Sequence, residues 1–179
     1  MSIPAGTHRL GPDHGNLSVR TGRTGAAAKA GHDLLIDVTS WEAMLEFGEG
    51  TRIELDVDGA SLRVREGSGG MQALDDDDKA SIQATIDDEV LKRQKITFRS
   101  TSVEIAGDRI TVEGDLTLVG ESRPIAFDVR LGVDGAFSGS AVVKQTDWGI
   151  KPYSTLFGAL KVADEVEVVF DVSLPSQSR

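Results

Sequence analysis

The sequence contains no cysteine, and only 5% of its 179 residues are aromatic. The missing thiols exclude disulfide bonds, thiolate catalysis and zinc sites built on sulfur. No apolar run is long enough to predict a transmembrane helix. The first ten residues, MSIPAGTHRL, also lack the basic start and apolar stretch of a signal peptide. These absences predict a cytoplasmic protein.

Positive charge is scarce as well, because 19 Lys and Arg residues face 29 Asp and Glu residues, for a formal net charge of -10. Such a surface repels the phosphates of nucleic acid, so no nucleic-acid partner is expected. His8, His14 and His32 have no metal-ligand spacing, and we expect neither a metal nor a cofactor. The length and the 39% hydrophobic content favour one domain over residues 1–179, with its core at about 8–174.

Apolar and polar residues alternate with a period of two along most of the chain, as in strands with one buried face. The Asp-Gly pair within residues 132–135, and similar breaks between the later segments, predict an antiparallel meander. Asp58-Gly59 allows either a hairpin or a bulge in one long strand, and local turn preferences favour the hairpin. The strand-like segments are residues 16–21, 34–47, 51–65, 95–105, 108–119, 124–131, 136–145 and 165–174.

Residues 75–94 depart from this alternation, because their Ile, Val and Leu residues recur at helical spacing behind four aspartates. An acidic first turn suits the helix dipole, so residues 75–78 predict a helix start rather than a metal site. A second short helix or turn is expected at residues 155–160.

This pattern of elements selects a fold class. Many strands in one domain must close a barrel or form a sandwich, and a lone amphipathic helix fits the end of a barrel better than the space between two sheets. We therefore predict a mainly β fold: a single extended antiparallel β-barrel of about eight strands, with one amphipathic helix covering an end.

The few aromatic residues are unevenly placed, because Trp148, Tyr153 and Phe157 share one connection broken by glycine and proline. The rings could line a barrel mouth that holds a ligand with an apolar body and a polar head. They could equally fill one end of the barrel as ordinary core. The sequence leaves both interpretations open.

Short motifs in a fixed order carry a resemblance to a known family. They are Asp13-His14, Gly31-His32-Asp33, the ITFRS segment at 96–100, the GDLTLVG segment at 114–120, Asp147-Trp148-Gly149-Ile150 and Asp164-x-Val166. From about residue 8 to residue 174, the chain resembles the YceI-like family of lipocalin-like, polyisoprenoid-binding proteins. The resemblance implies a lipocalin-like barrel with an elongated apolar cavity for a prenyl or fatty-acyl chain. It also implies one long bent strand at 51–65 in place of the hairpin, and it is consistent with a homodimer.

The resemblance further implies a function without catalysis: storage, transport or sequestration of an isoprenoid or fatty-acyl-type lipid. The candidates for the head-group contacts are His32, Lys144 and Lys151. The candidates for the apolar wall are Phe98, Leu116, Leu118, Phe127, Val129, Val143, Trp148, Tyr153, Phe157, Val168 and Phe170.

Two other functions remain as alternatives. The first is an enzyme acting on an amphiphile, with His32 and Asp147 as acid and base, which requires both side chains to reach one cavity. The second is a ligand-free stress-response or structural protein, which would have a filled interior and a large apolar patch on its outside.

Overall fold

The computed structural model describes residues 3–155, 158 and 160–175, and their secondary structure is mainly β. The helical elements are η1 (Pro12–His14), η2 (Ala28–Ala30), η3 (Gly59–Ser61), α1 (Asp76–Thr85), η4 (Ile86–Val90) and η5 (Gln145–Trp148). The strands are β1 (Gly6–Leu10), β2 (Gly15–Arg20), β3 (Arg23–Thr24), β4 (Asp33–Val38), β5 (Trp41–Phe47), β6 (Arg52–Val57), β7 (Leu62–Ser68), β8 (Ile96–Ala106), β9 (Arg109–Leu118), β10 (Glu121–Leu131), β11 (Ala136–Lys144), β12 (Ser154–Thr155), β13 (Leu160–Val162) and β14 (Glu165–Ser173).

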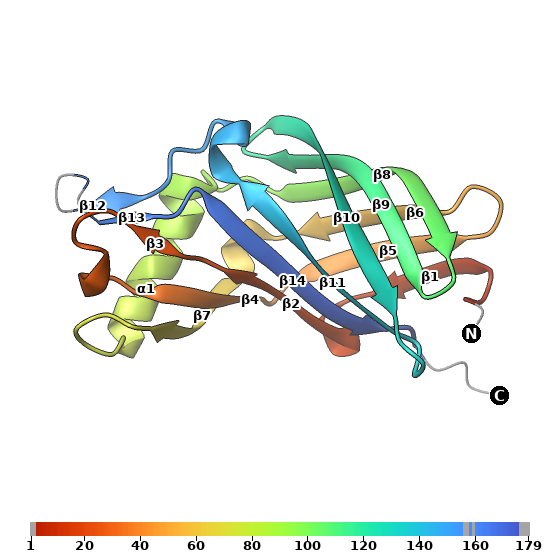
Figure 1. The fold of residues 1–179 in the computed structure, drawn as a ribbon, viewed down its shortest axis with the longest axis horizontal. Helices are drawn as coiled ribbons and strands as arrows, with labels where there is room; N and C mark the ends of the chain where they lie inside the picture. Colours follow the sequence, from red (N-terminus) through yellow and green to blue (C-terminus); the bar gives the residue numbers. More distant parts are fainter. Residues whose placement is uncertain (1–2, 156–157, 159, 176–179) are drawn as a thin grey trace.

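Eleven of the strands form one antiparallel sheet in the order β1-β5-β6-β8-β9-β10-β11-β14-β2-β4-β7. The sheet curls strongly into an elongated half-barrel (Figure 1). Because β2 pairs with both β14 and β4, the last long strand lies beside an early one. A second sheet, β12-β13-β3, lies with α1 at one end of the molecule (Figure 1).

All eight strand segments expected from the sequence are present, but the large sheet has eleven strands. The first difference is β1, which the alternation pattern does not reveal because only Leu10 among its residues is buried. The second is that segments 34–47 and 51–65 are each divided in two at a bend. Since β6 pairs with β5, and β7 with β4, the chain keeps its direction through η3. The hairpin favoured at Asp58-Gly59 is therefore wrong, and the long bent strand is confirmed.

Hydroxyl groups hold the two bends against each other. Thr39 Oγ1 donates to the Ser61 carbonyl oxygen at 2.7 Å, and Ser61 Oγ accepts from the Ser40 amide at 3.0 Å. Ser61 is only 4% exposed, and its hydroxyl also donates to the Asp58 carbonyl oxygen at 2.7 Å, so this buried group is satisfied. The bends are thus defined positions at which β4 turns into β5 and β6 into β7.

The expected helix is present, with the cap that its aspartates predict. Asp75 accepts from the Asp78 amide at 2.7 Å, and Asp78 accepts from the Asp75 amide at 3.1 Å, which is a capping box. The 10 residues of α1 continue into the five-residue π-helical turn η4, which ends at Val90 rather than at residue 94. The chain leaves the helix there because the next residues include Lys92 at φ 53° and Arg93 at φ 57°.

The helix covers one edge of the large sheet. Gln83 Oε1 accepts a 2.9 Å hydrogen bond from the amide of Val64 in β7, the strand at that edge. The apolar stripe of the helix, which includes Ile82, Ile86 and Val90, packs against the core. In the part of the chain that the structure describes, no helix has the length and apolar character needed to span a bilayer.

The interior at the opposite end of the molecule is filled by side chains. The rings of Phe47 and Phe137 stack there with centroids 6.3 Å apart. Ile110 is 2% exposed and Val112 has no exposed surface. This end is a close-packed core.

Candidate functional site

A cavity of about 490 Å³ lies at the end of the molecule that α1 covers. Its wall is built mainly from aliphatic side chains of the curled sheet, such as Ile36, Leu116 and Val168, and Ile82 and Ile86 of the helix close one side. Its volume falls within the roughly 300–1,000 Å³ typical of small-molecule sites. The cavity is therefore large enough and apolar enough for a hydrophobic ligand.

Polar side chains reach this cavity from the short elements at the same end, among them Arg23, His32, Gln145, Tyr153 and Lys161. Among the described residues that line it, none is Asp or Glu, although the chain carries 29 of them. The charged groups at the cavity are thus of the opposite sign to the net charge of the protein.

Arg23 is held in place by the loop that follows β7. Its Nη1 donates to the carbonyl oxygens of Gly31 and Ser68, the latter at 3.3 Å, and its Nε lies 3.7 Å from Asp33 Oδ1. The guanidinium packs directly on Gly69, whose φ of +80° and lack of a Cβ make room for it. The arginine is therefore positioned by the backbone and remains partly exposed, at 25% of its side chain.

His32 is fixed in a similar way. Its Nε2 donates to the Gln72 carbonyl oxygen at 2.5 Å, and its ring packs against Gly70. His32 lines the cavity, but Asp147 is exposed in η5 and is not part of the cavity wall. The acid and base pair of the enzyme alternative is therefore not brought together at this cavity.

The connection that begins with η5 is held by Gln145 and Asp164. Gln145 is 8% exposed and its Nε2 donates to the Ala163 carbonyl oxygen at 3.1 Å. The Asp164 carboxylate accepts from the amide and the hydroxyl of Thr146, at 2.9 and 2.6 Å. The hydroxyl bond is the main cause that lowers the pKa of Asp164 below its ordinary value of 3.8. These contacts fix the turn that carries Trp148.

In the aromatic connection, one ring belongs to the packed core and another lines the cavity. Trp148 is 3% exposed and its Nε1 donates to the Leu116 carbonyl oxygen at 2.8 Å, so it is part of the packed core. Tyr153 is 43% exposed and lines the cavity. Phe157 lies outside the described residues, as do residues 156 and 159 of the expected short helix or turn at 155–160. Of the described residues there, Thr155 ends the strand Ser154–Thr155 and Leu160 begins the strand Leu160–Val162.

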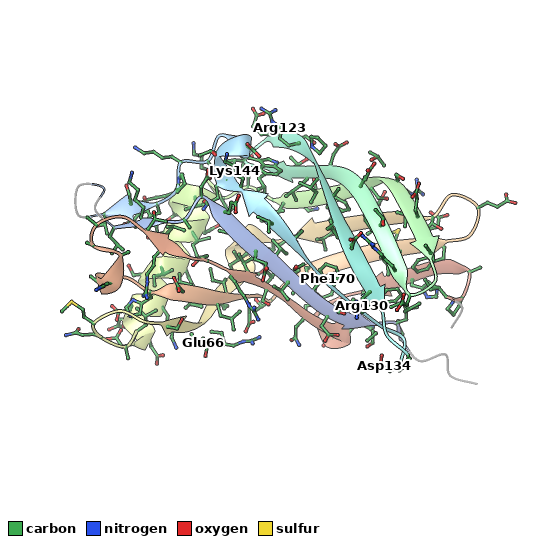
Figure 2. All side chains as sticks on the ribbon, viewed as in Figure 1. Glu66, Arg123, Arg130, Asp134, Lys144 and Phe170 are labelled. Carbon is green, nitrogen blue, oxygen red and sulfur yellow. The ribbon has the colours of Figure 1, made fainter. Side chains whose placement is uncertain are left out.

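The remaining candidate residues lie at the surface, in the packed interior or at the cavity wall. Lys144 is exposed at the end of β11 (Figure 2), and Lys151 lines a separate surface pocket with Pro152 and Asp164. Neither lysine is part of the apolar cavity wall. Val129 is buried at 6% exposure in the filled part of the core, and Phe98, Phe127 and Phe170 form a ring cluster beside the cavity. The candidates that line the cavity are Leu116, Leu118, Val143, Tyr153, Val168 and His32.

The polar residues at the cavity that were not among the sequence candidates include Arg23, Gln145 and Lys161. The pairing of β13 with β3 places Lys161 opposite Thr24 and Val162 opposite Arg23. Strands of two and three residues carry no alternation signal, so the sequence offers no local sign of this pairing. Among the described residues, no group of three His, Asp or Glu side chains is placed to hold a metal ion.

Fold and cavity together define a class of mainly β protein, in which a curled antiparallel sheet and one covering helix surround an apolar pocket. The chain belongs to the YceI-like domain family, whose family model matches residues 12–174. The resemblance drawn from the sequence motifs is therefore confirmed.

Individual relatives match over shorter stretches. A UPF0312 protein of Pseudomonas aeruginosa (strain LESB58) is 37% identical over 71 residues, which cover 35% of this chain and 37% of the relative. Protein YceI of Escherichia coli O157:H7 is 33% identical over 69 residues, which cover 34% of this chain and 36% of the relative. The aligned stretch thus spans little more than a third of the length of these curated relatives.

Solved structures extend the likeness to most of the fold. BcnA of Burkholderia cenocepacia matches with a TM-score of 0.62 and 16% identity, over 89% of this chain and 96% of that chain. A YceI protein of Campylobacter jejuni matches with a TM-score of 0.56 and 16% identity, over 79% and 85% of the two chains. At this level of identity the likeness supports the fold alone.

Proposed function

We propose that the protein binds one long-chain apolar or amphiphilic molecule, of the polyisoprenoid or fatty-acyl class, in the cavity beside α1. The observation that carries this proposal is the 490 Å³ apolar space inside a sheet that is otherwise well packed. In this proposal the long bent strands β4–β5 and β6–β7 complete the wall between β2 and β8, so that the sheet encloses its ligand as a barrel. Burial of the hydrocarbon chain of the ligand supplies most of the affinity, at about 0.8 kcal/mol per methylene group.

The polar end of the ligand lies at the mouth, near Arg23, His32 and Lys161. These side chains supply donors and positive charge, and no Asp or Glu among the described residues lines the cavity, so they favour a head that accepts hydrogen bonds or carries negative charge. The cations orient the ligand, and the aliphatic wall retains it. Lys144 and Lys151 have no part in this arrangement.

The ligand-free alternative receives less support. It requires a filled interior and a broad apolar patch on the outer surface, whereas the interior holds a cavity. The large apolar side chains found exposed among the described residues are Met71, Ile105, Val133, Val142 and Tyr153, and most lie on different elements.

The proposal is tested by native mass spectrometry of the full chain purified without detergent and then incubated with farnesol or palmitic acid. We expect a stoichiometric complex with one molecule of at least one of these lipids. Glucose, which is polar throughout, serves as the control and is expected not to bind. If neither lipid nor any co-purified organic-extractable lipid is retained, the proposed function is wrong.

A second experiment tests the position of the head group. Replacing Arg23 by methionine keeps much of the apolar length of the side chain but removes its charge, so we expect palmitic acid to bind about tenfold more weakly while farnesol is little affected. Isothermal titration calorimetry of both ligands measures the difference. The matched control is Lys144→Met, which removes a cation that is exposed and away from the cavity. Equal losses for the acid and the alcohol would show that Arg23 does not contact the head.

A further inference from the structure

The cavity ends at one level along the strands that form its wall. On β8 it is lined by Ile96 but not by Phe98, the next inward-facing residue, and on β14 by Val168 but not by Phe170. On β9, which lies between β8 and β10, the lining stops at Leu116. Phe170 lies about midway along the molecule (Figure 2). The hollow space therefore occupies one part of the interior and has a floor.

Three phenylalanine rings from alternate strands build this floor. Phe127 of β10 lies between the other two, with its ring centroid 5.6 Å from that of Phe98 in β8 and 6.0 Å from that of Phe170 in β14. The strands between them contribute glycines where the rings lie. A Cβ at Gly114 would lie 2.5 Å from Phe98 Cζ, and one at Gly139 would lie 2.8 Å from Phe170 Cζ. The glycines thus make room for the rings, so the layer is a specific feature of this sequence.

The interior behind the rings is filled. Phe127 pairs in register with Val112, which has no exposed surface, and Val129 is 6% exposed. Phe137, in the same filled part, is 5% exposed. Native cores pack as densely as organic crystals, so a chain that reaches the rings finds no further space.

We infer that the ring layer Phe98, Phe127 and Phe170 sets the maximum length of the lipid chain, an inference that rests on the proposed function. The cavity of about 490 Å³ lies in the lower half of the range for small-molecule sites. The protein therefore selects short prenyl chains, such as that of farnesol, and fatty-acyl chains of similar size. A longer lipid chain leaves its additional carbons outside the mouth, and these carbons add nothing to the binding free energy.

The test is a competition measured by native mass spectrometry, with an equimolar mixture of geraniol, farnesol, geranylgeraniol and longer all-trans prenyl alcohols. For the wild-type chain, occupancy is expected to rise from geraniol to farnesol and then to stop rising. Phe127→Ala removes the central ring, and the ratio of bound geranylgeraniol to bound farnesol is expected to increase about tenfold or more, because several further carbons become buried. Phe127→Leu is a milder variant that preserves folding, and it is expected to shift the ratio in the same direction.

Phe137→Leu is the matched control, because it shortens a ring of the filled core that does not belong to the floor. It is expected to lower the melting temperature without changing the length preference. A continued rise in affinity with chain length in the wild type would overturn the inference and leave lipid binding intact, as would identical preferences in the wild type and both Phe127 variants. Failure of every prenyl alcohol and of palmitic acid to bind would instead remove the proposed function itself.

Discussion

Replacement of Trp148 by alanine is expected to lower the free energy of unfolding by about 3–5 kcal/mol. The side chain is 3% exposed, so its removal leaves a large hole that the surrounding strands fill only in part. It also removes the indole hydrogen bond to the Leu116 carbonyl oxygen. Urea denaturation followed by circular dichroism measures the change.

Two further variants separate the causes of this loss. Trp148→Phe keeps most of the ring volume and removes the hydrogen bond, which is expected to cost about 1–3 kcal/mol. Tyr153→Ala lies in the same connection but truncates a ring that is 43% exposed, so we expect a change below about 1 kcal/mol. If Trp148→Ala were no more destabilising than Tyr153→Ala, the assignment of Trp148 to the core would be wrong.

Replacement of Val168 by tryptophan is expected to weaken lipid binding strongly. Val168 lines the cavity from β14, so the larger ring occupies space that the ligand needs. Each methylene that can no longer be buried costs about 0.8 kcal/mol, and exclusion of about three of them weakens binding roughly 50-fold. Farnesol binding measured by native mass spectrometry and calorimetry checks this result.

The control for the added ring is Val142→Trp on the neighbouring strand β11. Val142 is 58% exposed and pairs in register with Glu167, next to Val168, but it lies on the outer face of the sheet. The same ring is thus added one strand away without entering the cavity, and this variant is expected to bind farnesol like the wild type. Equal binding by both variants would mean that the lipid lies somewhere other than this cavity.

The alternation pattern predicted the long strands well because one face of each strand is buried. In segment 165–174 the inward residues Val166, Val168 and Phe170 do belong to the interior. The pattern could not locate the bends, since Thr39 and Ser61 form their hydrogen bonds only after two distant strands have paired. The π-helical turn that shortened the helix likewise gives no signal in the spacing of apolar residues.

The apolar character of the cavity was predicted, but the position at which it ends was not. The sequence identifies Phe98, Phe127 and Phe170 as inward-facing, but it does not show that their rings meet, because they come from strands that are not neighbours. The glycines at 114 and 139 were the available sign, since a glycine within a strand often marks the close approach of another group. The cations at the mouth depend on the pairing of β3 with β13, which no local pattern indicates.

The division of the interior into a hollow part and a filled part also affects the response to hydrostatic pressure. Folded states that enclose voids have a larger molar volume than states into which water has entered, so compression favours the hydrated states. We therefore expect the region around α1 and the cavity to take up water at a lower pressure than the filled part of the interior. The phenylalanine layer separates the cavity from the core around Val112, so we expect that core to stay free of water at pressures that already hydrate the cavity.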